Sequence, residues 1–391
     1  MAALKKPRRP KGSGSRLKTS GKKIIKKKVK KVKKTSLKKK TVKLSKKVSG
    51  RKKIKETELT RSPNNPIIEP RAYTWESKAT LNPAAFIANG KIHLVYRAIG
   101  DNDSSVLGYA GSYDGYNITD RPTHYIYKRF GNFAKPDLSL SPIDYISGGG
   151  WNGGCEDPRL TRIGDMVYML YTAFDGWGSV RITLTSIPLA DFENKKWNWK
   201  KPVMISPPGE IHKNWVLFPE KINGKFAILH SMSPKILIEY VGRMEDFDGT
   251  KFIHSVHQGS PEWQLREKGI RGVGPAPIKT ELGWLILYHA IEEHDPNRYK
   301  LFAMILDIKN PAKTLYRSTS PILEPDENYE NEGYKWGVIY SCGAVVKDGT
   351  LFVYYGGADK VIGVAVIKLS DLLADLKKHK AVKLKKHSAE I

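Results

Sequence analysis

The sequence predicts an all-β fold, a five-bladed β-propeller preceded by a disordered Lys-rich N-terminal tail. Three observations predict it: a hairpin pattern that occurs five times, a further strand after each hairpin, and helical periodicity that is convincing only near Leu369–Leu376. A hairpin with at least one more strand, repeated about every 60 residues, fits the four-stranded blades of a propeller. A β-sandwich or a two-domain β protein is the alternative.

Each hairpin combines an apolar strand, a glycine-containing turn and a second strand rich in aromatic and β-branched residues. Asn-Gly and Asp-Gly pairs mark such turns because both central positions need a positive φ. The expected hairpins are Ala85–Tyr96, Arg159–Tyr171, Glu220–His230, Ile278–Tyr288 and Ala344–Tyr355, and the strands expected after them are Val106–Ser112, Val180–Ile187, Lys235–Val241, Tyr299–Ile308 and Val361–Leu369. Propeller blades converge on an axial pocket, so the ends of these hairpins should face one another.

The formal net charge of +28 is concentrated in two terminal segments. Residues 1–55 contain 26 Lys or Arg and no Asp or Glu, and residues 377–391 contain six Lys and one Glu. A segment this polar cannot bury enough apolar surface to offset its chain entropy. We therefore expect a disordered basic tail over 1–60, a catalytic propeller domain over 61–376 and a basic C-terminal tail over 377–391.

The basic tail predicts non-specific binding of a polyanion such as nucleic acid. Lysine runs attract phosphate backbones electrostatically, and residues 1–55 contain no aromatic side chain for base stacking. The alternative is a solvated tail without a specific partner. Nothing in the sequence indicates an oligomeric state.

Several classes of protein are excluded by composition. Two cysteines, Cys155 and Cys342, are too few for a disulfide scaffold. No apolar run approaches the ~18 residues of a transmembrane helix, so no membrane partner is expected. No apolar segment follows the basic N-terminus as in a secretory signal, which favours a cytoplasmic location. Because no His-x-x-x-His or Cys-x-x-Cys spacing occurs, no metal site is expected either.

Charged and polar side chains recur at the ends of the predicted hairpins. Such groups are costly beside apolar runs unless they are paired or used, so their recurrence at one phase of a repeat indicates a functional site. In chain order they are Asn82 and Arg97, then Glu156, Asp157 and Arg159, then Lys213, then Arg271 and His289, and finally Tyr355 and Asp359.

The strongest local signal is the segment Gly153–Arg159. Its glycines allow a ligand to approach the backbone closely, and Pro158 restricts the chain on both sides. Glu156 and Asp157 form a compact charged cluster with Arg159. The alternative interpretation is an Asp-Pro turn with a structural ion pair.

Several segments together resemble glycoside hydrolase family 130, the β-mannoside phosphorylases and β-mannosidases. They are Asn82-Pro83-Ala84, Tyr96-Arg97-Ala98, Gly153–Arg159, Leu217-Phe218-Pro219-Glu220-Lys221, Trp284–His289 and Tyr354–Asp359. The resemblance covers about residues 60–370 and implies a five-bladed β-propeller, in agreement with the number of hairpins.

The resemblance implies that Asp157 is the catalytic acid of an enzyme that inverts the mannose anomeric carbon. Inorganic phosphate would attack as co-substrate while Asp157 protonates the glycosidic oxygen of a β-mannoside, releasing α-mannose 1-phosphate. One acid suffices because phosphate is already a competent nucleophile, so no cofactor is expected. The implied substrate-binding residues are Asn82, Arg97, Glu156, Arg159, Tyr355 and Asp359, and the implied phosphate-binding residues are Lys213, Arg271 and His289.

The sequence departs from the family pattern at the phosphate site. Ser231 replaces the Arg that usually follows the His at the end of the third hairpin, and Ile270 falls where a Lys is expected. This thinner set of cations keeps an inverting β-mannosidase open as an alternative, with Glu220 as the base that activates water. A non-catalytic propeller that binds glycan or polyanion is the second alternative.

Overall fold

The computed structural model describes residues 57–129, 135–143, 150, 152–267 and 269–380. This part of the chain is mostly β, with short helices in the connections between strands. The predictions for the basic tail over 1–55 fall outside the described residues. Within those ranges, no helix is long and apolar enough to cross a membrane.

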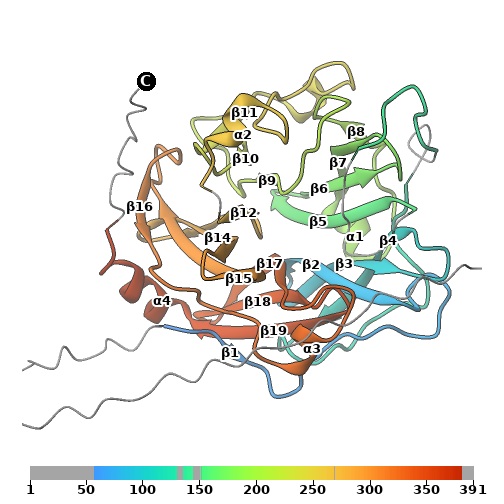
Figure 1. Ribbon diagram of the computed structural model, residues 1–391. Coiled ribbons are helices and arrows are strands. Elements are labelled where there is room, and N and C mark those ends of the chain that lie inside the picture. The colour runs from blue at the N-terminus through green and yellow to red at the C-terminus, as the bar shows by residue number, and fades with distance from the viewer. Residues whose placement is uncertain (1–56, 130–134, 144–149, 151, 268, 381–391) are drawn as a thin grey trace, which may run out of the picture. The chain divides into compact units, whose positions relative to one another are not determined.

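The described strands form four sheets, and the seven-stranded sheet β2–β8 divides where β4 and β5 meet through one parallel pair, Ser105 with Gly154. With that division the strands make five consecutive antiparallel units that follow one another around a common centre (Figure 1). The first two units are β2 (Ala79–Ala88), β3 (Lys91–Ile99) and β4 (Ser105–Ser112), and β5 (Gly154–Ile163), β6 (Met166–Phe174), β7 (Val180–Pro188) and β8 (Val203–Met204). The third is β9 (Val216–Leu217), β10 (Phe226–Ser231) and β11 (Leu237–Val241). The fourth is β12 (Ile270–Val273), β13 (Ile278–Thr280), β14 (Gly283–Glu292), β15 (Asp295–Leu306) and β16 (Thr314–Arg317), and the fifth is β17 (Ile339–Lys347), β18 (Thr350–Gly357) and β19 (Val361–Lys368). In each unit the first strand lies nearest the centre.

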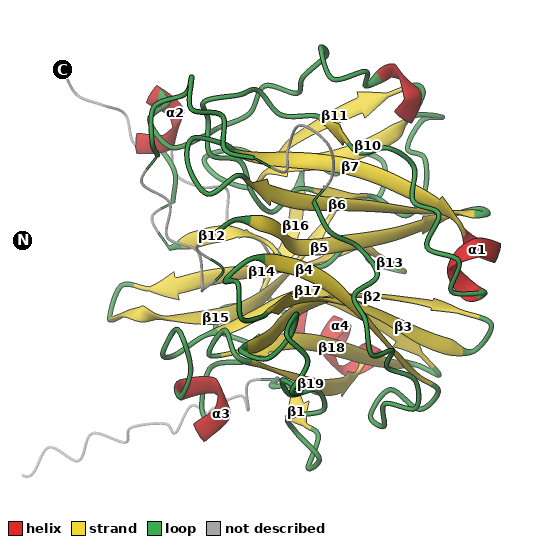
Figure 2. Cartoon of the chain, turned by 90° about the vertical axis from the view of Figure 1, so that its right-hand side faces the viewer, coloured by secondary structure: helices red, strands yellow, loops and turns green. Residues whose placement is uncertain are grey.

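Four short α-helices connect or follow these strands. In the part of the chain that the structure describes they are α1 (Leu189–Glu193), α2 (Pro261–Gln264), α3 (Asn328–Asn331) and α4 (Leu369–Leu376), and a 3₁₀ turn lies at Met244–Asp246. Figure 2 shows α1, α2 and α3 at the outer ends of the strands. The helix expected near residues 369–376 is confirmed as α4, whose buried leucines pack against the fifth unit.

The fifth unit is completed by the N-terminal end of the described chain. Strand β1 (Thr60–Arg61) pairs antiparallel with β19, Thr60 opposite Val366. Leu59 before it is buried, and the backbone N–H of Leu59 donates to the Ile322 carbonyl. The domain boundary expected at residue 60 therefore falls inside a segment that packs on the body, because the apolar side chain at 59 has a place in the core. The C-terminal boundary expected at residue 376 also lies inside the packed body, because Lys380 forms an antiparallel β-bridge with Tyr316.

Four of the five predicted hairpins are confirmed, as β2–β3, β5–β6, β13–β14 and β17–β18. The third is wrong in its first strand. The turn at Asn223-Gly224 is present and the second strand is β10, but the first strand is β9 (Val216–Leu217), which begins before Glu220 and pairs with β10 across this turn; next to the turn, Ile222 and Lys225 also pair. Pro219 explains the difference, because a residue without a backbone N–H interrupts a strand ladder. All five strands expected after the hairpins are present as β4, β7, β11, β15 and β19.

Apolar side chains fill the five spaces between neighbouring units. In β2, Ala84 and Phe86 pack towards the second unit, whereas Ala85 packs towards the fifth. The same alternation places other buried clusters between the second and third, third and fourth, and fourth and fifth units. Successive residues of a strand point to opposite faces, so a strand that is buried on both faces is apolar almost throughout. This packing holds the inner strands in fixed positions around the centre.

We expect Leu287→Ala to destabilise the protein by about 2–5 kcal/mol. Leu287 lies in β14 with 1% of its surface exposed, between the fourth and fifth units, so its truncation leaves a cavity. The measurement is the free energy of unfolding from chemical denaturation. The matched control is Leu265→Ala, whose side chain is 74% exposed; an equal loss in both variants would contradict the packing described here.

Candidate active site

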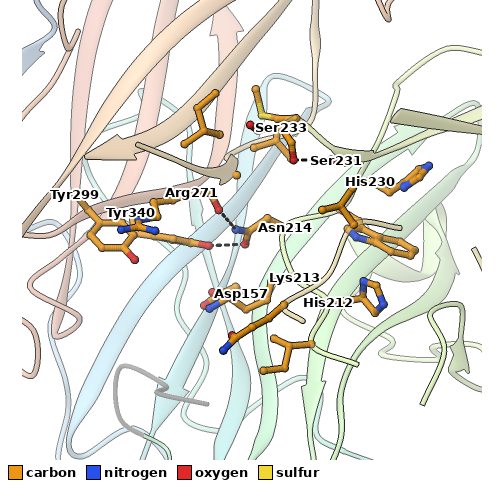
Figure 3. Close-up of a pocket in the computed structure, with 18 of the residues that line it drawn as sticks. Asp157, His212, Lys213, Asn214, His230, Ser231, Ser233, Arg271, Tyr299 and Tyr340 are labelled. Carbon is orange, nitrogen blue, oxygen red and sulfur yellow. Dashed lines mark hydrogen bonds between the residues drawn. The ribbon is translucent and has the colours of Figure 1, made fainter. Parts of the chain in front are cut away.

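A cavity of about 430 Å³ lies where the five units meet, and each unit or its connections contributes to its wall. Figure 3 shows Asp157, Lys213, Asn214 and Arg271 directed towards it from different elements. Six of the ten predicted site residues line the cavity: Asn82, Arg97, Asp157, Lys213, Arg271 and Asp359. The other four, Glu156, Arg159, His289 and Tyr355, do not line it.

Two β-bulges direct Asn82 and Asp157 into the cavity. The ladder shifts register between Leu81 and Ala84 in β2, and between Glu156 and Arg159 in β5. Asn82 and Asp157 have φ values of 50° and 49°, a left-handed conformation that Asn and Asp tolerate better than most residues. A proline follows each, where the interrupted ladder needs no donor. The two Asn/Asp-Pro pairs are thus equivalent features of neighbouring units.

Asp157 is held as a carboxylate by its surroundings. Asn82 Nδ2 donates to Asp157 Oδ1 at 2.8 Å, and Arg97 Nη1 lies 3.4 Å from the same oxygen. Burial would raise the pKa of Asp157, but Arg97, Arg159, the Asn82 hydrogen bond and Lys213 together keep that pKa below its ordinary value. These cations favour the ionised form of Asp157, and an anion bound in the cavity would oppose their effect.

Glu156 positions Arg97 from behind the cavity wall. Arg97 Nη2 lies 3.0 Å from Glu156 Oε1, and Arg97 Nε donates to Ser105 Oγ at 2.9 Å. Glu156 is fully buried. It precedes the bulge, so it points to the opposite side of β5 from Asp157. The expectation that Glu156 contacts substrate is corrected accordingly: it fixes the guanidinium that does line the cavity.

Arg159 also lies outside the cavity, with its donors directed at protein atoms. Nη1 donates to the Asp157 carbonyl at 2.6 Å, Nε to the Gly274 carbonyl at 3.2 Å, and Nη2 to Asn214 Oδ1 at 2.9 Å. Arg159 is 2% exposed. Its role in this geometry is to fix the backbone of Asp157 and the side chain of Asn214, not to bind sugar.

His289 supports the cavity wall through Tyr340. Its Nε2 accepts the backbone N–H of Ser341 at 2.9 Å, and its ring stacks on Tyr340 with centroids 4.1 Å apart. Burial, with the nearby Arg159, lowers the pKa of His289 to about 3. His289 is thus neutral and enclosed, so the expectation that it contacts phosphate is not met in this structure. Tyr340, not His289, lines the cavity.

Tyr355 is enclosed in the layer between the fourth and fifth units. Its hydroxyl donates to Glu330 Oε1 at 2.8 Å and lies 2.9 Å from the Tyr329 hydroxyl. The strand alternation that points Tyr354 to one interface points Tyr355 to the other. Tyr355 is therefore a core residue, and its predicted contact with substrate is corrected.

Asp359 reaches the cavity from the turn after β18. It has a φ of 54° and is 6% exposed. Burial raises the pKa of Asp359 to about 6, against the opposing effect of Lys335 and Arg97. Among the described residues, Asp157 and Asp359 are the two carboxylates that line the cavity, and their pKa values are shifted in opposite directions.

Sequence analysis missed several residues of the cavity wall. Asn214 (φ 64°) accepts hydrogen bonds from Tyr340 and Arg159 and donates to the Arg271 carbonyl at 3.1 Å (Figure 3). Lys335, in the connection between α3 and β17, lies 4.2 Å above the ring of Tyr299. The missed lining residues include Asn214, Tyr340, Lys335, Arg266, Trp263 and Tyr299. Only Asn214, directly after Lys213 and prone to positive φ, carried a local signal.

The cavity has a surplus of positive charge. Five Lys or Arg side chains line it, against the two carboxylates, and they are Arg97, Lys213, Arg266, Arg271 and Lys335. A low-dielectric wall with this balance favours an anionic ligand. In the described part of the chain, no group of three or more His, Cys, Asp or Glu is arranged to hold a metal ion.

Two buried carboxylates, polar side chains suited to sugar hydroxyls and a cationic wall are typical of an enzyme that transfers a glycosyl group to an anion. A family model described as beta-1,4-mannooligosaccharide phosphorylase matches residues 38–378. The chain belongs to glycoside hydrolase family 130, and it is an enzyme of the β-mannoside phosphorylase class. The resemblance stated from the sequence motifs is thus confirmed.

Individual relatives agree with this assignment. The chain is 38% identical over 326 residues to a 1,2-beta-oligomannan phosphorylase of Thermoanaerobacter sp., covering 81% of this chain and 99% of that protein. It is 27% identical to a beta-1,4-mannooligosaccharide phosphorylase of Ruminococcus albus, covering 81% and 90%. The structure of beta-1,2-mannobiose phosphorylase from Listeria innocua with beta-1,2-mannobiose matches with a TM-score of 0.60 and 25% identity, covering 82% and 99%.

Tyr355→Phe is expected to leave kcat and KM for sugar and phosphate unchanged while lowering the free energy of unfolding by about 1–3 kcal/mol, because Glu330 loses a buried partner. The matched variant is Tyr340→Phe, which removes a hydroxyl in the cavity wall and should impair turnover. Steady-state kinetics and denaturation of both variants test this. A raised KM for sugar in Tyr355→Phe would restore the sequence-based prediction.

Asp359→Asn should become more stable than the wild type as pH rises from 4 to 7. A carboxyl group whose pKa is raised on folding favours the folded state below its unfolded pKa, and this contribution is lost as pH rises through the folded value of about 6. The amide does not titrate, so the difference in free energy of unfolding should grow by up to about 3 kcal/mol. Denaturation at pH 4, 5, 6 and 7 measures it; a constant difference contradicts the raised pKa.

Proposed function

We propose that this protein is an inverting β-1,2-mannoside phosphorylase with a five-bladed β-propeller fold. The observation that carries the proposal is the single acid Asp157, held on a β-bulge and surrounded by cations, in a cavity with a surplus of positive charge. The five antiparallel units and the five apolar layers between them support the propeller. The higher identity to the β-1,2 relative than to the β-1,4 relative supports the linkage.

The reaction exchanges one bond at the mannose anomeric carbon for another. A phosphate oxygen forms a bond to C1 on the face opposite the leaving group, and the glycosidic C1–O bond breaks. The proton of Asp157, passed on directly or through a sugar hydroxyl, goes to the departing oxygen, so α-mannose 1-phosphate and the shortened sugar leave. Phosphate binding supplies the negative charge that raises the pKa of Asp157 from its ligand-free value and lets the carboxyl be protonated.

We assign the polar residues around Asp157 to the mannose unit that is transferred. Asn82 orients the acid and Arg97 lies against the same carboxylate, so both sit where the scissile bond must lie. Asp359, across the cavity, is suited to accept hydrogen bonds from sugar hydroxyls. Lys213 and Arg271 are assigned to phosphate. Glu156 and Arg159 act through the residues that they hold in place.

The hydrolase alternative lacks its proposed base in this geometry. Glu220 does not line the cavity; its side chain is half exposed and pairs with Lys279 at 2.5 Å. An inverting hydrolase needs a second carboxylate that activates water at ~6.5–9.5 Å from the acid; among the described residues the second carboxylate of the cavity is Asp359, which we assign to sugar hydroxyls. Membership of a family of phosphorylases also argues against the second alternative, a non-catalytic propeller that only binds glycan or polyanion. Binding of polyanions by residues 1–55 and a cytoplasmic location stay predictions.

Mixing the protein with β-1,2-mannobiose and inorganic phosphate should release α-mannose 1-phosphate, at a rate that depends on phosphate. Asp157→Asn should lower kcat by about 10²–10⁴-fold and leave sugar affinity unchanged, because the amide keeps the shape of the site and cannot deliver a proton. The control is Asp165→Asn, an exposed acid in the β5–β6 turn. Free mannose formed at a rate that ignores phosphate would establish hydrolysis instead.

A further inference from the structure

Two arginines at one side of the cavity have no carboxylate partner. Arg266 and Arg271 both line the cavity and are half-buried. In the described part of the chain, neither guanidinium takes part in an ion pair, and Arg271 Nε is buried without a hydrogen-bond partner. Burial, followed by the charge of Arg271, lowers the pKa of Arg266. Two like charges brought together in this way are unfavourable unless an anion joins them.

The other cations of the cavity are already offset by acids. Arg97 lies against Glu156 and Asp157. The charge of Lys335 lowers the pKa of Asp359 more than any other neighbouring charge does, and the charge of Lys213 lowers the pKa values of both Asp157 and Asp359. The surplus positive charge of the cavity is therefore concentrated on the Arg266–Arg271 pair.

Arg266 is held in place by contacts that do not use up its hydrogen-bond donors. Its guanidinium carbon lies 4.0 Å from the centre of the Trp263 ring, a stacking that leaves the edge N–H groups available. The backbone N–H of the next residue, Glu267, donates to Ser233 Oγ at 2.6 Å, which ties this segment to the end of the third unit. The Glu267 carboxylate is committed to Arg317, at 3.0 Å and 3.2 Å. The segment is thus built to present Arg266 without neutralising it.

We infer that Arg266, supported by Trp263, binds inorganic phosphate together with Arg271 and determines the affinity for this co-substrate. The inference rests on the proposed function and adds a residue that the sequence motifs did not indicate. Each planar guanidinium can donate two parallel hydrogen bonds to phosphate oxygens. Ser231 lines the same cavity close to Ser233, so the Arg266 segment supplies, from the following connection, a cation that position 231 does not. In the reverse reaction the same pair binds the phosphate group of α-mannose 1-phosphate.

The test is the kinetics of Arg266→Ala with neutral β-1,2-mannobiose as the sugar. We expect the KM for inorganic phosphate to rise about 10- to 100-fold, the loss of a charge-assisted hydrogen bond, and the KM for mannobiose to change less than about twofold. Arg162→Ala, an exposed arginine of β5, is the matched control and should behave as the wild type. A KM for phosphate within about twofold of the wild type in Arg266→Ala overturns the inference. So does an unchanged phosphate KM accompanied by weaker binding of a phosphorylated acceptor sugar, because the pair would then serve the acceptor.

The supporting role of Trp263 is tested by a double-mutant cycle. Trp263→Ala should raise the KM for phosphate in the same direction as Arg266→Ala, and the double variant should be no worse than Arg266→Ala alone, because the stacking acts only through Arg266. Fully additive effects would overturn that role. Calorimetric titration of inorganic phosphate into each variant gives an independent value, and the thermal midpoint identifies a variant that is simply less folded.

Different results would contradict the proposed function and the assignment of Arg266. If the wild-type protein releases free mannose at a rate independent of phosphate, the proposed function is wrong. If the activity of the wild type depends on phosphate but Arg266→Ala has the same KM for phosphate as the wild type, only the assignment of Arg266 is wrong.

Discussion

The geometry of the site depends on one buried guanidinium. Arg159 reaches the Asp157 carbonyl in the second unit, Asn214 before the third, the Gly274 carbonyl in the fourth and, at 3.4 Å, the Tyr340 hydroxyl in the fifth. Four units are thus joined by one side chain that does not line the cavity. A charge so enclosed is tolerated because its donors are satisfied by carbonyl and amide oxygens. The acid and the cavity wall are held at a fixed separation in consequence.

The arrangement of charge explains how a single acid can work beside phosphate. In the ligand-free cavity the cations keep Asp157 ionised, which is the wrong state for a proton donor. An incoming dianion reverses the local balance of charge. In the proposed reaction, phosphate binding and protonation of the acid are coupled, because the charge of the nucleophile favours the protonated carboxyl.

Much of the fold could be predicted from the sequence because its signals are local. Turn pairs such as Asn89-Gly90 and the alternation of apolar residues mark strands without knowledge of their neighbours. The first strand of the third hairpin was given the wrong bounds, because Pro219 interrupts the ladder and the regular pairing with β10 lies before it, at Val216–Leu217. At the site, Asp157 and Asn82 were identified by the proline that follows each of them.

The wrong assignments at the site share a physical cause. Glu156 and Arg159 flank a bulge. A register shift of one residue there changes which side chains face the cavity and which lie behind its wall. Tyr355 and His289 are polar residues at strand ends, and only packing shows that they are enclosed. The place of Arg266 in the cavity could not be predicted from the sequence. It depends on tertiary contacts of this segment with Trp263, Ser233 and Arg271.

The pairing of β1 with β19 has a consequence for how the chain is made. The first described strand to leave the ribosome pairs with the last described strand, Thr60 opposite Val366. Until β19 emerges, the fifth unit is missing and the apolar faces of the first and fourth units lack their cover. Such long-range closure slows folding and leaves nascent chains exposed to aggregation. The fifth unit of this enzyme is therefore completed only when β1 and β19 are both available.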